Sequence, residues 1–131
     1  MKTVFADTGY YIALVNSEDE YHLRAREYTA SFRGSFLTTS WVLLELANHL
    51  AKEPNRALFL SLFDDLRKNQ RVRILPPAQA EFDRGIEPYR HRPDKDWSLT
   101  DCVSFVVMRD HGVNEALSTD RNFEQASLSR C

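Results

Sequence analysis

Short apolar runs alternate with segments of helical spacing along most of the chain. Strands are predicted where β-branched and apolar residues gather in short runs, at residues 3–6 (TVFA), 36–40 (FLTTS), 72–75 (VRIL) and 115–119 (EALST). Between them, apolar side chains recur every three or four positions, which predicts helices. Strands that alternate with helices indicate an α/β fold with a mostly parallel sheet.

The helices are expected where this spacing is bounded by caps and breakers. The first begins near residue 10, capped by Asp7 or Thr8, and Gly85 and Pro88 weaken the end of the one over 78–89. The others are expected over 19–32, 41–52, onward from Pro54, 98–112 and 120–126. No internal repeat and no linker interrupts the 131 residues, so the whole chain, 1–131, is expected to form a single domain.

Two acidic residues directly follow predicted strands. Asp7 comes after the first strand and Asp120 after the last. In an open parallel sheet, ligands bind at the carboxyl ends of the strands. Both carboxylates are therefore expected to face one crevice.

Two more acidic residues lie in predicted helices. Glu45 interrupts the apolar run WVLLELA, and a buried carboxylate there needs a partner, either a metal ion or His49 four residues later. Asp101 shares a helical stripe with Phe105 and Met108, so it is expected on the inward face.

Each acid also has a local explanation that the sequence leaves open. The alternatives are an N-cap for Asp7, a capping box with Ser98 for Asp101, an Asx-turn for Asp120 and a pair with His49 for Glu45. Caps and turns imply no relation among the four positions. If the four carboxylates do converge, oxygen ligands without a thiolate or histidine cluster favour Mg²⁺ or Mn²⁺ over zinc.

Charge and cysteine content exclude few classes of protein. The 17 Lys and Arg against 19 Asp and Glu give a net charge of −2, which neither indicates nor excludes a nucleic-acid binder. The two cysteines form no zinc spacing, and there is no signal peptide or apolar membrane span, so a reduced, cytoplasmic protein is expected. Candidate substrate contacts are Arg92 and Lys95 before Asp101 and Arg121 beside Asp120, and Trp97 could stack on a base.

Four segments together resemble the PIN-domain ribonucleases, and most closely the VapC-type toxins. They are VFADTGYYIALVN, SWVLLELANHL, SLTDCVSFVVMRDHG and ALSTDRNFEQA. The resemblance implies a three-layer α/β/α fold whose metal-binding acids are Asp7, Glu45, Asp101 and Asp120. It also implies that the neighbouring hydroxyl residues, which match Thr8, Ser98 and Thr119, orient these carboxylates.

The resemblance further implies an endoribonuclease that depends on Mg²⁺ or Mn²⁺, forms a homodimer and is silenced by a small antitoxin. The alternatives are a PIN-fold nuclease of RNA processing without an antitoxin, and a non-catalytic nucleic-acid-binding module. One departure is the end of the chain, SLSRC, which is short and polar where the family usually continues into an apolar strand. The edge of the sheet is therefore expected to be short or truncated.

Overall fold

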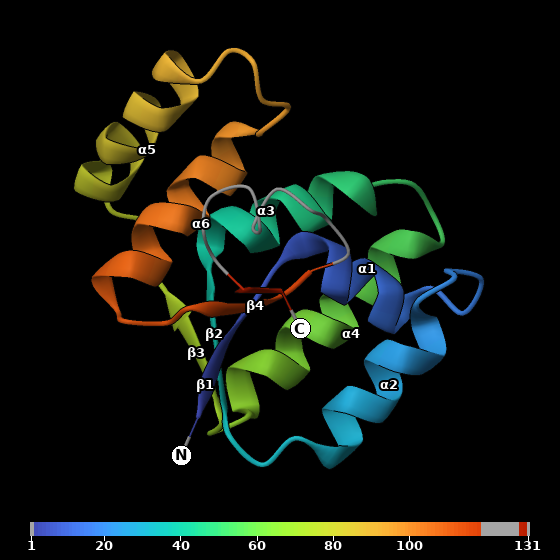
Figure 1. Cartoon of the computed structure of the whole chain (residues 1–131). Helices are drawn as coiled ribbons and strands as arrows, with labels where there is room; N and C mark the ends of the chain where they lie inside the picture. Colours follow the sequence, from blue (N-terminus) through green and yellow to red (C-terminus); the bar gives the residue numbers. More distant parts are fainter. Residues whose placement is uncertain (1, 119–128, 131) are drawn as a thin grey trace.

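A parallel sheet forms the centre of the molecule (Figure 1). The computed structural model describes residues 2–118 and 129–130, and within them the strand order is β3-β2-β1-β4-β5. The strands are β1 (Thr3–Ala6), β2 (Ser35–Thr39), β3 (Val72–Leu75), β4 (Glu115–Leu117) and β5 (Ser129–Arg130). The four strands predicted from sequence are present, and the polar tail adds the two-residue strand β5 alongside β4.

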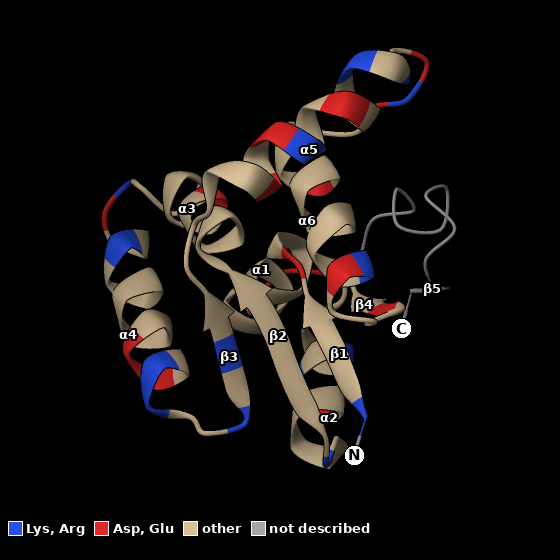
Figure 2. Ribbon diagram, turned by 90° about the vertical axis from the view of Figure 1, so that its left-hand side faces the viewer, with Lys and Arg blue, Asp and Glu red and all other residues tan. Residues whose placement is uncertain are grey.

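Six helices surround the sheet in the described part of the chain. They are α1 (Thr8–Val15), α2 (His22–Ser31), α3 (Ser40–His49), α4 (Asn55–Lys68), α5 (Gln79–His91) and α6 (Leu99–Asp110). Figures 1 and 2 show α1, α2 and α4 on one side of the sheet and α5 and α6 on the other, with α3 near the carboxyl ends of the strands. This is the three-layer α/β/α arrangement expected. The helix predicted over 120–126 lies outside the described residues.

Helix α5 departs from the sequence prediction at its end. It passes through Pro88 and continues to His91, and the backbone N–H of Arg92 still donates to the Pro88 carbonyl at 3.1 Å. Gly85 has a packing role, because a Cβ there would lie 2.6 Å from Val103 Cγ2 and 3.1 Å from Val103 Cα. The glycine therefore lets α5 pack closely on α6 and does not mark a helix end.

The buried apolar residues of the sheet and of the helices packed on it form one continuous core. Val4, Phe5 and Ala6 of β1 are fully buried, as expected for a central parallel strand covered on both faces. All residues of α6 from 101 to 108 are buried as well. Asp101, Phe105 and Met108 therefore share the inward face, as predicted. None of the helices in residues 2–118 combines the length and the apolar character needed to cross a membrane.

Candidate functional site

Strands β1 and β4 lie side by side at the point where the strand order reverses. In an open α/β sheet this switch point is where a ligand crevice forms, at the carboxyl ends of the strands. The pairing places Phe5 opposite Ala116 and Ala6 opposite Leu117. The next residues along each strand, Asp7 and Ser118, therefore meet at the crevice.

Asp7 is buried there with one carboxylate oxygen paired and the other unpaired. Its side chain is 4% exposed, and the Ser118 hydroxyl donates to Oδ2 at 2.9 Å. Oδ1 has no hydrogen-bond partner among the described residues. Asp7 occupies the N-cap position of α1, but its side chain makes no capping hydrogen bond. The local explanation from sequence, a plain N-cap, therefore does not account for this carboxylate.

The environment of Asp7 shifts its carboxyl group toward the protonated form. Burial raises the pKa of the Asp7 carboxyl from 3.8 to about 7, and the negative charge of Asp101 adds to the rise. Hydrogen bonds from Ser118 and the Thr8 backbone lower the pKa in part, and the charge of Glu45 raises it further. Three of the four predicted acids are therefore close enough to interact electrostatically.

Asp101 forms the capping box that the sequence left open, and its carboxylate also lies near Asp7. Its backbone N–H donates to the Ser98 hydroxyl at 3.0 Å, and its Oδ2 accepts from the Ser98 N–H at 3.1 Å. This reciprocal pair is a complete capping box at the start of α6. The carboxylate is also 7% exposed and raises the pKa of Asp7, so the cap holds Asp101 in place beside the crevice.

The expectation that α3 is a fully buried helix was wrong. Leu44 is 57% exposed, and the neighbouring Glu45 is only half-buried. No ion pair joins Glu45 to His49 in residues 2–118, although that pair was one predicted alternative. A half-buried carboxylate keeps part of its hydration, so Glu45 does not need the partner that full burial would have required.

The hydroxyl that contacts the Asp7 carboxylate is Ser118, which the sequence reasoning missed. The pairing of β1 with β4 would have indicated it, because Ser118, the residue after β4, lies opposite Asp7, the residue after β1. Thr8 has a buried hydroxyl with no partner among the described residues. Thr119, Asp120 and Arg121 lie outside the described residues. The roles predicted for these residues stay predictions.

The donors fit a hard divalent cation held largely through water. Within residues 2–118 and 129–130, no three His, Cys, Asp or Glu side chains converge closely enough to form a complete metal site. Mg²⁺ commonly takes only one or two carboxylates directly and keeps several waters. The unpaired Oδ1 of Asp7 and the mutual repulsion of Asp7, Asp101 and Glu45 are both features that a cation would relieve.

The predicted substrate contacts in the loop before α6 are partly engaged within the protein. Arg92 donates to both carboxylate oxygens of Asp94 at 3.1 Å, and its guanidinium lies 5.5 Å from the Trp97 ring centroid. Lys95 is half-buried. Trp97 is 8% exposed and packs edge-on against Phe105, so the idea that Trp97 stacks on a base was wrong.

We expect the metal-free protein to lose stability as the pH rises from about 4 to 7. The pKa of Asp7 is 3.8 unfolded and about 7 folded, so the folded state binds the proton more tightly across this window. The stabilisation is complete below the unfolded pKa and is lost as the pH rises through the folded pKa, a change of roughly 4 kcal/mol. Urea unfolding with a chelator at several pH values measures it. The Asp7→Asn variant is the reference, and equal pH profiles for the two proteins would contradict the assignment.

Replacing Ser118 with alanine is expected to weaken metal binding about 10- to 100-fold, because Ser118 orients the Asp7 carboxylate. The Mn²⁺ concentration that gives half-maximal thermal stabilisation measures this effect. Ser104→Ala is the matched control. It also removes a buried hydroxyl, but the Ser104 hydroxyl, unlike that of Ser118, has no partner among the described residues. A shift of the same size in both variants would show that Ser118 has no special role.

The comparisons with known proteins cover nearly the whole chain. The curated 23S rRNA-specific endonuclease VapC20 of Mycobacterium tuberculosis is 26% identical over 125 residues, which is 95% of each protein. The crystal structure of VapC20, described as a sarcin–ricin loop cleaving toxin, superposes with a TM-score of 0.87 at 25% identity over 95% of both chains.

Two more distant structures share the fold. FitAcB from Neisseria gonorrhoeae matches with a TM-score of 0.66 at 16% identity, over 97% of this chain and 95% of the other. VapBC2 from Rickettsia felis, solved with a DNA fragment from its promoter, matches at 0.66 and 13% identity, over 98% and 97%. The PIN domain family model matches residues 4–128. With the fold, the sheet order and this match in agreement, the chain belongs to the PIN-domain family.

Proposed function

We propose that the protein is a metal-dependent endoribonuclease that hydrolyses RNA phosphodiester bonds and is the toxin of a toxin–antitoxin pair. The observation that carries the proposal is the buried Asp7 carboxylate at the switch point, coupled to Asp101 and Glu45. Supporting it is the likeness to VapC20, an endonuclease specific for 23S rRNA. The substrate class we propose is therefore structured RNA, such as a ribosomal RNA hairpin.

In this proposal Asp7 and Asp101 are the principal ligands of Mg²⁺ or Mn²⁺, with Glu45 and Asp120 completing the acidic set. A bound divalent cation would supply a water of lowered pKa and offset the charge that builds on the phosphate oxygens. Ser118 fixes one oxygen of Asp7, and Ser98 fixes one oxygen of Asp101. Both carboxylates are thus positioned by the ends of β4 and α6 before any ligand arrives.

The partners proposed are a small antitoxin and a second copy of this chain. The support is a likeness of fold, because VapBC2 matches over nearly its whole length. We also place the protein in the cytoplasm, where RNA is available to it. The sequence of the neighbouring reading frame tests the pairing. A small gene whose product forms a complex with this protein and stops its activity would support the pairing, and the absence of any such inhibitor would overturn it.

Cleavage of an RNA panel tests the enzymatic proposal. Hairpins with the sarcin–ricin sequence and scrambled hairpins are incubated with the protein and Mn²⁺ or Mg²⁺, with and without a chelator. Cleavage should require the metal, stop with the chelator and return when metal is added in excess. The metal should also raise the melting temperature, since at 100 times its dissociation constant it adds about 2.7 kcal/mol to the stability of the folded state. Cleavage that persists in the chelator would overturn the proposed metal dependence.

A further inference from the structure

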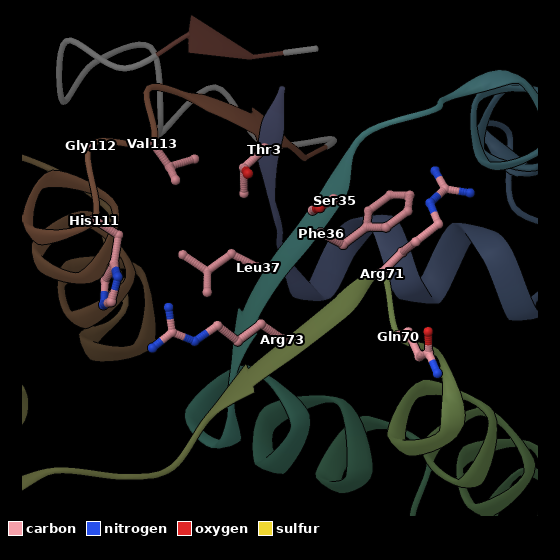
Figure 3. Close-up of a pocket in the computed structure, with 10 residues that line it drawn as sticks. All are labelled: Thr3, Ser35, Phe36, Leu37, Gln70, Arg71, Arg73, His111, Gly112 and Val113. Carbon is pink, nitrogen blue, oxygen red and sulfur yellow. The ribbon is translucent and has the colours of Figure 1, made fainter. Parts of the chain in front are cut away.

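A cavity lies at the amino ends of the strands, at the opposite end of the sheet from Asp7 and Ser118. It has a volume of about 500 Å³ and is formed by β1, β2, β3 and the end of α6 (Figure 3). Thr3 and Ser35 lie at one side, Leu37 and Val113 supply apolar surface, and Arg73 and His111 supply nitrogen donors. This size is within the range of cavities that bind small ligands.

The charged side chains among the described residues that line this cavity are all basic. Figure 3 shows the Arg73 guanidinium pointing toward the His111 ring, with Leu37 beside them. In residues 2–118, neither side chain has a hydrogen bond or an ion pair. None of the described lining residues is acidic. The two donors are therefore available to an anionic ligand.

The other charged groups around the cavity are already engaged. Arg71 donates through Nε to the Gly34 carbonyl at 2.9 Å and lies over the Phe36 ring, so its guanidinium holds the β2 and β3 ends together. Asp110, at the end of α6, is paired with Arg84 at 2.6 Å. Arg73 thus keeps its charge unneutralised beside the cavity in a protein whose net charge is −2.

We propose that this cavity is a second phosphate-binding site, which holds a backbone phosphate of the RNA away from the cleaved bond. The inference rests on the proposed function. The planar guanidinium of Arg73 can donate two parallel hydrogen bonds to phosphate oxygens, and the His111 ring can donate another. The hydroxyls of Thr3 and Ser35 can hydrogen-bond the ribose, and Leu37 and Val113 supply apolar lining.

The position of α6 sets the distance between the two sites. Asp101 lies in its first turn and His111 is its C-cap, so the two residues are ten positions apart and about 15 Å apart along the helix. At about 3.4 Å per stacked nucleotide, this distance needs at least four or five nucleotides, because α6 is buried from 101 to 108 and the RNA has to pass around it. The negative end of the α6 dipole faces the cavity, so the side chains and not the helix must hold the phosphate. RNA with arms shorter than about four nucleotides should not reach both sites.

Cleavage kinetics with substrates of different arm length test the proposal. Arms of two and of ten nucleotides on each side of the cut are compared in the wild type, Arg73→Ala, Arg73→Lys and His111→Ala. For the long substrate, Arg73→Ala should raise KM about tenfold with kcat unchanged and lower the salt dependence of binding by about 0.7 in logarithmic slope. The short substrate should be unaffected, and Arg73→Lys should restore part of the affinity. Arg26→Ala on α2 is the control for a general loss of charge.

Titration with adenosine monophosphate and with inorganic phosphate, followed by backbone NMR, tests the cavity without any cleavage. Chemical shift changes at residues 35–37, 73 and 111–113 that disappear in Arg73→Ala would support a phosphate site. If the same protein cut no RNA, that result would overturn only the proposed function. Phosphate binding with no dependence on arm length would mean a free small phosphate compound as the ligand and would overturn the RNA assignment. No shifts at the cavity, or equal effects of Arg73→Ala and Arg26→Ala, would overturn the site itself.

Discussion

Replacing Asp7 with asparagine is expected to lower kcat for RNA cleavage about a thousandfold or more, while stabilising the metal-free protein at neutral pH. The loss of activity follows because the negative charge at the switch point is removed. The gain in stability follows because the buried carboxylate, with a pKa of about 7, is costly to ionise beside Asp101 and Glu45. Asparagine has the same shape and can still accept the hydrogen bond from Ser118.

Two measurements separate this outcome from a simple folding defect. Urea unfolding with a chelator should give Asp7→Asn equal or higher stability than the wild type at pH 7. Added Mn²⁺ should then stabilise the wild type but not the variant. Asp64→Asn, an exposed acid on α4, is the matched control for loss of one negative charge. A stable Asp7→Asn protein that still cleaves RNA at the wild-type rate would contradict the proposed metal site.

Most of the fold could be predicted because local patterns and global topology agree. Each of the four predicted strands, β1 to β4, contains a short apolar run, and Ser98 with Asp101 forms the capping box that the sequence signature indicates. The end of α5 could not be predicted, because Pro88 and Gly85 usually weaken a helix. Here the contact of Gly85 with Val103 outweighs that local preference.

The sequence placed two of the predicted acids correctly but not the groups around them. Asp7 and Asp101 could be placed inward, because each follows from a strand end or a helical stripe. The exposure of Glu45 could not be predicted, since an apolar run does not show which face of its helix meets solvent, and Leu44 on the same helix is exposed. Ser118 was missed because its role depends on the pairing of β1 with β4, which is a long-range property.

Two variants of Asp101 can distinguish a structural role of this residue from a catalytic one. Asp101→Asn keeps an oxygen that can accept from the Ser98 N–H, so the cap on α6 should survive while the charge is lost. Asp101→Ala removes both this side-chain acceptor and the charge, and keeps only the bond from the backbone N–H to the Ser98 hydroxyl. We expect both variants to lose RNA cleavage about a thousandfold. Only Asp101→Ala should also lose about 1 kcal/mol of stability.

Ser98→Ala is the reciprocal variant, because it removes the hydroxyl that accepts from the Asp101 N–H and leaves every carboxylate in place. It should lose about 1 kcal/mol of stability, and its rate of cleavage should fall far less than that of either Asp101 variant. Urea unfolding with a chelator and single-turnover cleavage with Mn²⁺ measure the two quantities on the same samples. If Asp101→Asn were as unstable as Asp101→Ala and still cleaved RNA, Asp101 would be only a helix cap. The electrostatic coupling to Asp7 would then have no part in the chemistry.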